Sequence, residues 1–482
     1  MPSVRDSVEL TQRYIAGESS AEATVAACRK IVDAREPKVG AFLALDWEGA
    51  QTQARELDAR RKRGEKLGPL AAVPIAIKDN IHVNGLETTC ASKILQGFKA
   101  PYDATVTARL KQAGAIIIGK LNLDEFAMGS SCENSALKQT RNPFDLSRVP
   151  GGSSGGSAAC VAARMAMLSL GSDTGGSIRL PASFCGVVGV KPSYGRVSRY
   201  GLVAFASTLD QIGPFALTVR DAALCLQVMA GRDEHDATSS SEIVPDYAKS
   251  LRTDCKGLRV GFVKAHFDEC QNREVADSCW AGVQRMKALG ASLVEIELPH
   301  AAAGLSVYYV VASAEASSNL SRFDGVRYGP REKRATVIES YFATRGHGFG
   351  PEVKRRVMLG TYALSAGAYD EYYGRASKVR TLIVNDYKAA FGHCDVIASP
   401  CAPFTAFKAG EKSDPLSMYL CDIYTIPASM AGLAALSLPC GADKQGMPIG
   451  LHLSAAPYAE STLFGAASAL EADLGLSLDP KL

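Results

Sequence analysis

The sequence lacks the motifs that mark several common classes of enzyme and binding protein. Its 482 residues contain no GxxxxGK[ST] phosphate-binding loop, no dinucleotide fingerprint and no Cys/His spacing typical of a zinc site. No apolar run approaches the roughly 20 residues that a membrane span needs. The net charge is +3 and there is no basic tail, so composition gives no electrostatic case for direct nucleic-acid binding.

The cysteines and the first residues indicate an intracellular protein. Thirteen cysteines are scattered without a CxxC pair, and an odd number is not expected of a disulfide framework. Residues 1–10 are polar and charged, unlike a secretory leader. We therefore expect reduced thiols and a cytoplasmic location, without membrane association.

Alternating helix and strand patterns predict an α/β fold. Apolar strands are expected at 72–78, 115–119 and 168–170, with a helix at 104–113 between the first two. This alternation is typical of one large mixed, mostly parallel sheet covered by helices. No linker divides the chain, so we expect a single domain over residues 1–482. A mostly helical insertion is expected around 300–390, with an exposed loop at 325–350.

Two turns rich in glycine and serine are the most informative part of the sequence. Residues 151–157 read GGSSGGS, and residues 171–177 read GSDTGGS. Glycine lets backbone N–H groups approach a ligand, and serine can attack an acyl carbon. We expect Ser177 to be a nucleophile, with an oxyanion held by the N–H groups of Thr174, Gly175 and Gly176.

A serine nucleophile needs a base, and lysine is the best candidate here. None of the seven histidines lies in a recognisable triad context. Lys78 ends a strand of apolar residues, where burial would keep its amine neutral. Ser153 or Ser154 would relay the proton. From the residues alone, the 151–157 run is equally compatible with a flexible linker or an anion-binding nest.

Three blocks together resemble the amidase signature family. They are residues 74–80 (PIAIKDN), 151–157 and 171–181 (GSDTGGSIRLP), with 75 residues between Lys78 and Ser153 and 24 between Ser153 and Ser177. The family uses a Ser–cis-Ser–Lys triad. The resemblance implies that Ser177 is the nucleophile, Ser153 the cis-serine that shuttles the proton, and Lys78 the general base.

Four further blocks are similar to one branch of that family, the A subunits of heterotrimeric tRNA-dependent amidotransferases. These blocks are residues 123–130, 191–207, 209–214 and 321–329. The resemblance implies hydrolysis of glutamine and transfer of ammonia to the B subunit, in a complex that also contains the C subunit. It implies conversion of Glu-tRNA(Gln) or Asp-tRNA(Asn), with the charged tRNA bound mainly through the B subunit. ATP and Mg are then expected on the partner, and no cofactor or metal in this chain.

Free glutamine would require groups that recognise its α-carboxylate and α-ammonium. An arginine suits the first and an aspartate the second. By position in the resembling blocks, we expect Arg356 and Asp422 to serve, with Tyr308 or Tyr309 lining the site. Arg355 is an alternative to Arg356.

Asp173 and Arg179 flank the nucleophile turn and are expected to be structural partners.

Two other functions are compatible with the same motifs. A stand-alone amidase acting on small amides would use the same triad without needing Arg356 or Asp422. A catalytically inactive anion-binding scaffold is the third possibility, and the presence of all three triad residues argues against it.

Overall fold

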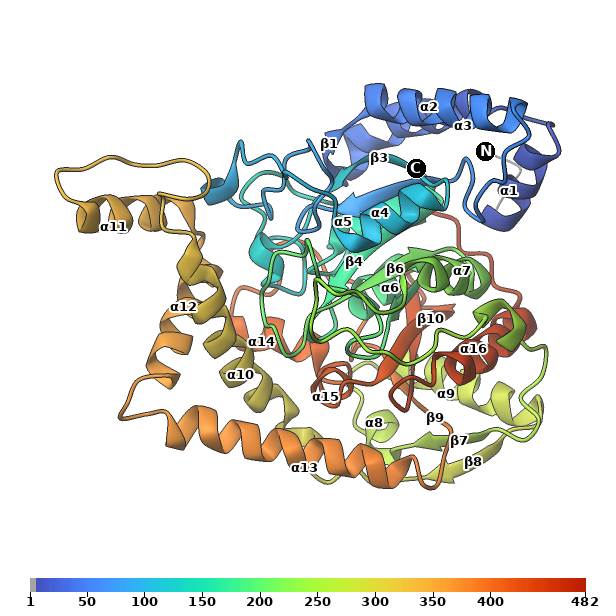
Figure 1. The fold of residues 1–482 in the computed structure, drawn as a ribbon. Coiled ribbons are helices and arrows are strands. Elements are labelled where there is room, and N and C mark those ends of the chain that lie inside the picture. The colour runs from blue at the N-terminus through green and yellow to red at the C-terminus, as the bar shows by residue number, and fades with distance from the viewer. Residues whose placement is uncertain (1–5) are drawn as a thin grey trace.

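An eleven-stranded sheet forms the centre of the computed structural model, which describes residues 6–482 (Figure 1). The strands lie in the order β1-β3-β2-β4-β6-β5-β10-β11-β9-β7-β8. Their bounds are β1 Phe42–Leu45, β2 Pro74–Lys78, β3 Ile116–Leu121, β4 Leu168–Asp173, β5 Val188–Lys191, β6 Gln211–Ala216, β7 Arg259–Phe262, β8 Ser292–Glu295, β9 Val396–Pro400, β10 Ala434–Ala442 and β11 Pro448–Ala455.

Helices cover both faces of this sheet. Those before β8 are α1 Ser7–Ile15, α2 Ala21–Val39, α3 Trp47–Lys62, α4 Thr105–Gln112, α5 Gly155–Ala162, α6 Arg179–Cys185, α7 Val219–Met229, α8 Lys264–Asp268 and α9 Arg273–Ala288. Those after β8 are α10 Gly304–Asn319, α11 Val337–Gly348, α12 Pro351–Ala363, α13 Arg375–Ala390, α14 Pro415–Tyr419, α15 Ile426–Met430 and α16 Glu460–Leu474.

The sheet is mixed, as expected, but parallel pairs do not predominate. Across residues 6–482, six of the ten strand pairs are antiparallel and four are parallel. The expectation of a mostly parallel sheet is therefore wrong. β10 and β11 are joined by a turn of five residues, and so short a connection permits only antiparallel pairing.

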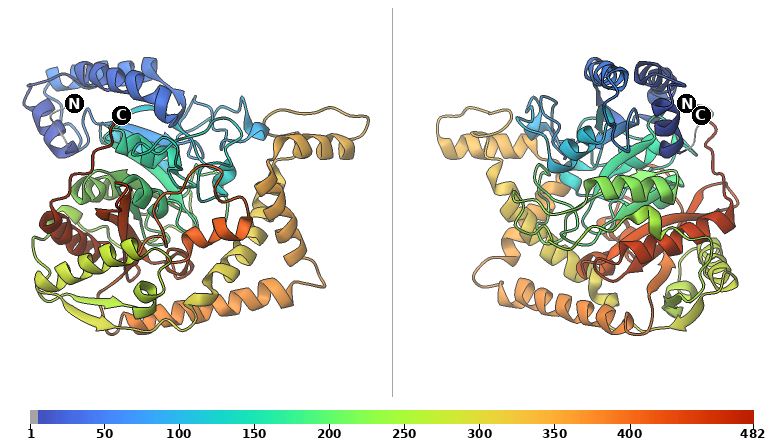
Figure 2. Two further views of the ribbon diagram at one scale, coloured as in Figure 1. Left: turned by 180° about the vertical axis from the view of Figure 1, so that it is seen from behind. Right: turned by 45° about the vertical axis from the view of Figure 1, so that its right-hand side comes forward.

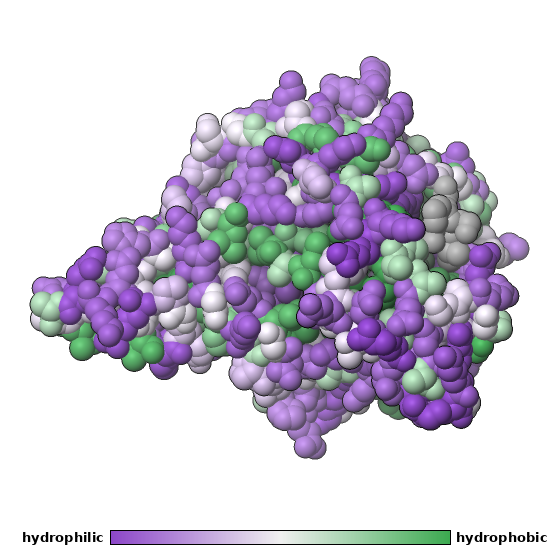
Figure 3. Space-filling view, turned by 90° about the horizontal axis from the view of Figure 1, so that it is seen from above, coloured by the Kyte–Doolittle hydropathy of each residue, from purple (hydrophilic) through white to green (hydrophobic). Residues whose placement is uncertain are grey.

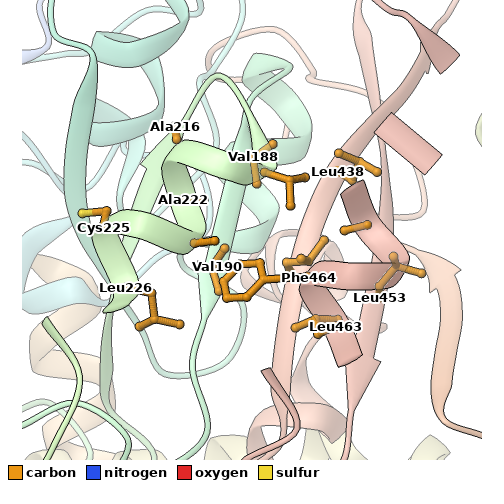
Figure 4. Close-up of a cluster of buried hydrophobic side chains, with 14 of the residues drawn as sticks. Val188, Val190, Ala216, Ala222, Cys225, Leu226, Leu438, Leu453, Leu463 and Phe464 are labelled. Carbon is orange, nitrogen blue, oxygen red and sulfur yellow. The ribbon is translucent and has the colours of Figure 1, made fainter. Parts of the chain in front are cut away.

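Alternating side chains of the strands supply the cores on the two faces. In β2, Ile75 and Ile77 join one buried cluster and Ala76 joins another, because successive strand residues point to opposite faces. The first cluster is packed between the sheet and α7 and α16, where Val190 and Leu453 of the sheet approach Phe464 of α16 (Figure 4). Figure 2 shows helices on both sides of the sheet in two further views.

Residues 301–390 form helices and contribute no strand to the sheet. Figure 1 shows α10, α12 and α13 at one side of the molecule, with α11 projecting beyond them. The loop expected at 325–350 is wrong in part, because α11 occupies its second half. Thr336 and Glu339 form a capping box that begins this helix, each side chain accepting a hydrogen bond from the other residue's backbone N–H.

The parallel pairing of β2 with β4 brings the predicted lysine and the second Gly/Ser turn together. Ile77 is paired with Leu170, so both strands end at the same edge of the sheet. Lys78 is the last residue of β2, and Asp173 is the last of β4. Such an edge, at the carboxyl ends of parallel strands, is where ligands bind in open α/β sheets.

Candidate active site

Lys78 is fully buried and surrounded by hydroxyl groups. Its Nζ lies within hydrogen-bond distance of Ser153 Oγ at 2.8 Å, Ser154 Oγ at 2.8 Å and Ser172 Oγ at 2.9 Å. None of these partners carries a charge. Burial lowers the pKa of Lys78 to about 7, although the Asp124 carboxylate acts in the opposite direction. The amine is therefore substantially neutral near neutral pH, as a general base requires.

The first Gly/Ser run is a buried, ordered segment rather than a linker. Gly152 and Ser153 are joined by a cis peptide bond, at the serine for which the resemblance implies one. The Asp124 N–H donates to Ser153 O at 3.1 Å, and the Asp124 carboxylate accepts from Cys132 N at 2.8 Å. A Cβ on Gly152 would lie 2.0 Å from Asp124 Oδ2, so only glycine fits at this position.

The second turn leaves its backbone N–H groups free. Those of Thr174, Gly175, Gly176 and Ser177 donate no hydrogen bond to any residue in the described range 6–482. The turn itself is held from the sides: Thr174 Oγ1 donates to Asp210 Oδ1 at 2.7 Å, and Ser177 O accepts from Ser154 N at 3.2 Å. A fixed turn with free N–H groups is the geometry that an oxyanion site needs.

The structure brings Lys78 and Ser153 into direct contact and places Ser177 on the adjoining segment. The Ser177 hydroxyl has no hydrogen-bond partner among residues 6–482. Its side chain is nearly buried. Catalytic hydrogen bonds are often long or unmade before substrate binds, so this arrangement is compatible with a nucleophile.

Asp173 and Arg179 form a fully buried ion pair behind the nucleophile turn, as expected. Arg179 Nε and Nη2 donate to the two Asp173 oxygens at 3.0 Å each. Arg179 also donates to Thr425 O at 2.9 Å and to Ser429 Oγ at 2.7 Å. The arginine holds the pKa of Asp173 below its usual range despite burial. The pair joins the turn to the segment that leads to α15.

Burial distinguishes the two candidate arginines on α12. The side chain of Arg356 is 3% exposed and that of Arg355 is 43% exposed. Arg356 Nε donates to Glu352 Oε1 at 2.7 Å, and its guanidinium lies 4.8 Å from the centre of the Tyr309 ring. Arg355 pairs with the same glutamate from the outside.

Tyr308 and Asp422 border the turn directly. A Cβ on Gly175 would lie 2.8 Å from Tyr308 Cζ, and one on Gly176 would lie 2.2 Å from Asp422 Oδ1. Asp422 Oδ2 accepts from Ser130 Oγ at 2.5 Å. Burial raises the pKa of Asp422 to about 7, while the hydrogen bond from Ser130 opposes that increase.

Five residues of the site are not singled out by the sequence motifs. They are Ser172 and Asp124, which contact the base and the cis-serine, and Asp210, Thr425 and Glu352, which hold the turn and the arginine. Ser172 and Asp124 lie within blocks that carry the resemblance. For Ser172, the sequence does offer a signal of its place in the site, because it lies just after the apolar strand 168–170 and two residues before Thr174.

Neither a metal cluster nor a membrane helix is found in the part of the chain that the structure describes. No group of three or more His, Cys, Asp or Glu residues within 6–482 could hold a metal ion. No helix in that range is long and apolar enough to cross a membrane. The thirteen cysteines are free thiols, all buried.

Comparison with known proteins identifies the family. The family model described as Amidase matches residues 22–464. This chain belongs to the amidase family. It is 59% identical over 438 residues to the A subunit of glutamyl-tRNA(Gln) amidotransferase from Gloeobacter violaceus, covering 90% of each chain. The relation therefore extends over most of the sequence.

Solved amidase structures share the whole fold. The crystal structure of the A subunit of glutamyl-tRNA(Gln) amidotransferase from Thermotoga maritima superimposes with a TM-score of 0.80 at 41% identity, over 96% of this chain and 95% of that one. The peptide amidase of Stenotrophomonas maltophilia superimposes with a TM-score of 0.85 at 29% identity, over 99% and 98%. The fold alone thus does not separate the two activities.

Proposed function

We propose that this chain is the glutamine-hydrolysing A subunit of a tRNA-dependent amidotransferase. It releases ammonia from glutamine, and its partners, the B and C subunits, use that ammonia to convert Glu-tRNA(Gln) or Asp-tRNA(Asn) to the amidated form. ATP, Mg and the charged tRNA are bound mainly by the B subunit, in the cytoplasm. No cofactor or metal takes part in this chain's own reaction.

One observation carries the choice of glutamine as substrate. Asp422 is buried beside the Ser177 turn, and the buried Arg356 acts electrostatically on it, which supports the two as the groups that recognise the substrate. A free amino acid carries an α-carboxylate and an α-ammonium that an arginine and an aspartate can recognise, and a simple amide needs neither. The 59% and 41% identities to A subunits, against 29% to the peptide amidase, support the same choice.

Hydrogen-bond directions favour Ser153 over Ser154 as the proton relay. Ser154 Oγ donates to Ser172 O at 3.1 Å, so its proton is already engaged. It can therefore only accept from Lys78. Ser153 Oγ contacts Lys78 alone among residues 6–482, so its proton is free to point at the amine lone pair. A neutral lysine has two N–H donors, which Ser154 and Ser172 accept.

The reaction then proceeds in two halves. Lys78 takes the proton of Ser153, which takes that of Ser177, and Ser177 Oγ attacks the side-chain amide carbon of glutamine. The free N–H groups of Thr174, Gly175 and Gly176 stabilise the oxyanion. The proton passes to the leaving nitrogen, ammonia departs, and a glutamyl ester remains on Ser177. Water, activated through the same relay, hydrolyses the ester to glutamate.

The test is ammonia release from glutamine by the purified chain, alone and with the B and C subunits, together with amidation of the charged tRNA. Activity that increases with the partners and disappears in Ser177→Ala supports the proposal. A stand-alone amidase would turn over simple amides well by itself, ignore the partners and show no activity on glutamine. An inactive scaffold would fail to react with a fluorophosphonate at Ser177.

A further inference from the structure

The surroundings of Arg356 indicate how this buried cation is used. Hydrophilic residues, which water solvates, predominate on the face of the molecule that Figure 3 shows. Arg356 is not solvated in this way, because its side chain is only 3% exposed. A buried charge is costly unless groups of the protein replace the lost water. The groups that replace it here leave part of the guanidinium without a partner.

Three aromatic rings surround the guanidinium. Its Cζ atom lies 4.8 Å from the ring centre of Tyr309, 5.4 Å from that of Tyr419 and 5.6 Å from that of Phe205. Tyr309 and Tyr419 stack with their ring centres 3.8 Å apart, although Tyr309 lies on α10 and Tyr419 ends α14. The faces of the rings attract the cation and restrict its orientation, but they leave its N–H groups to other partners.

Only one edge of the guanidinium has a hydrogen-bond partner. Arg356 Nε donates to Glu352 Oε1 at 2.7 Å, and Glu352 lies one helical turn earlier on α12. The described residues 6–482 offer no hydrogen-bond acceptor to either Nη1 or Nη2. Buried N–H groups in proteins nearly always have an acceptor, so this edge is available for a ligand. The two Nη atoms of an arginine can grip a carboxylate with two parallel hydrogen bonds.

The arginine lines a cavity that extends to the proposed ammonium site. The cavity has a volume of about 250 Å³, and its walls include Arg356 as well as Gly129 and Ser131, which lie on either side of Ser130. The hydroxyl of Ser130 donates to Asp422. The cavity therefore connects the free edge of the arginine with the surroundings of the aspartate.

Glu352 is the centre of the contacts that fix the arginine. Its Oε1 atom accepts from Tyr419 Oη at 2.9 Å as well as from Arg356 Nε, and its Oε2 atom accepts from Arg355. Tyr419 is itself held by its stacking on Tyr309. Without this carboxylate the long side chain of Arg356 would have no partner at Nε. Ordering it would then lower the affinity for a substrate.

We propose that Glu352 and Tyr419 are positioning residues, which hold Arg356 by its Nε so that both Nη groups meet the α-carboxylate of the substrate. The assignment rests on the proposed function and deepens it, because it places the selection of an amide with an α-carboxylate in α10, α12 and α14. The α-carboxylate is remote from the reacting amide, so this contact is equally strong before and during the reaction. Its loss should therefore raise KM and leave kcat unchanged.

The test compares Glu352→Ala with the unaltered chain on glutamine and on γ-aminobutyramide, which is glutamine without its α-carboxylate. We expect the KM for glutamine to rise at least about ten-fold, the loss expected for a hydrogen bond to a charged group, with kcat within about two-fold. The kcat/KM for γ-aminobutyramide should stay within about two-fold, because that amide does not use the arginine. An unchanged KM for glutamine, or equal losses on both amides, would overturn the assignment.

Two milder variants keep the test decisive if Glu352→Ala folds poorly. Glu352→Gln retains an oxygen that can accept from Arg356 Nε, so its KM for glutamine should stay within about three-fold of the unaltered chain. Tyr419→Phe removes one hydrogen bond from the carboxylate and should raise KM about two- to five-fold. A Glu352→Gln variant as impaired as Glu352→Ala, or a Tyr419→Phe variant with unchanged KM, would contradict positioning through these hydrogen bonds.

The matched control breaks a similar ion pair elsewhere. Glu9 and Arg13 have the same i, i+4 spacing on α1, and both are exposed. Figures 1 and 2 show α1 and α12 at opposite sides of the molecule. Glu9→Ala should therefore behave like the unaltered chain on both amides. Fluorophosphonate labelling of Ser177 in every variant shows that the site is still folded.

A double variant separates positioning from direct contact with the substrate. In Arg356→Gln the two Nη groups are gone, so adding Glu352→Ala should change the KM for glutamine by less than about two-fold. A full additional loss would mean that Glu352 acts on the substrate by itself, and would overturn the positioning role. If the unaltered chain releases no ammonia from glutamine, the proposed function itself fails. If it does and Glu352→Ala has the same KM, only the positioning role fails.

Discussion

The buried lysine predicts how the acylation rate depends on pH. In the proposed mechanism, only the neutral amine of Lys78 can accept the proton that Ser177 gives up through Ser153. With a pKa of about 7, set by burial, the amine is neutral in a minority of molecules below that pH and in most above it. The rate should therefore rise as the pH rises, because the active form is the deprotonated one.

The size of the effect follows from the titration of one group. Between about pH 6 and about pH 8, the neutral fraction of a group with this pKa increases about ten-fold, and above that it is nearly constant. A lysine with its ordinary pKa would instead give a rate that continues to increase about ten-fold for each pH unit up to about pH 10.

The rate of Ser177 labelling by a fluorophosphonate is the cleanest assay. The reagent carries no α-ammonium, so ionisation of Asp422, which also has a pKa near 7, does not enter. Labelling should level off above about pH 8, and Ser177→Ala supplies the blank. A rate that is flat from pH 6 to 8, or one still rising steeply at pH 9, would refute the reasoning about Lys78.

Two further predictions concern the substrate and the turn. Arg356→Gln should raise the KM for glutamine by about 10- to 100-fold, the loss expected for a hydrogen bond to a charged group, while Arg355→Gln leaves it within about two-fold; equal effects from steady-state ammonia release would contradict the assignment. Gly176→Ala should reduce kcat/KM for glutamine by at least about ten-fold, since its Cβ would collide with Asp422 and Thr425. Gly346→Ala on α11, where nothing lies within 4 Å, is the control and should behave like the unaltered chain.

The parts of the site that lie on short continuous motifs are predictable from the sequence. Lys78 ends a strand of apolar residues, and a lysine in that position stands out because its burial is costly without partners. The Gly/Ser turns are equally visible, although their residues alone do not exclude a linker. Their role as turns of an active site comes from the resemblance, and the structure shows them buried at one sheet edge.

Contacts between distant segments are not predictable in the same way. Asp210 reaches Thr174 because β6 pairs antiparallel with β4, and the sequence contains no sign of that pairing. The wrong expectation of a mostly parallel sheet has the same origin. It rests on the helix–strand alternation near the N-terminal end, which does not extend to the rest of the chain. Helix α11 does have a local signal, because Thr336 and Glu339 have the spacing of a capping box.

The two glycines before the nucleophile join substrate recognition to transition-state stabilisation. Their N–H groups are free for the oxyanion, and the space above them is taken by Tyr308 and Asp422 rather than by side chains of their own. The aspartate that we propose for the α-ammonium is therefore placed against the backbone that we propose for the developing charge. A substrate held by that ammonium presents its amide to the turn in a fixed orientation, and a small amide without it does not gain this alignment. In the proposed function, selectivity for glutamine thus arises at the turn that carries Ser177.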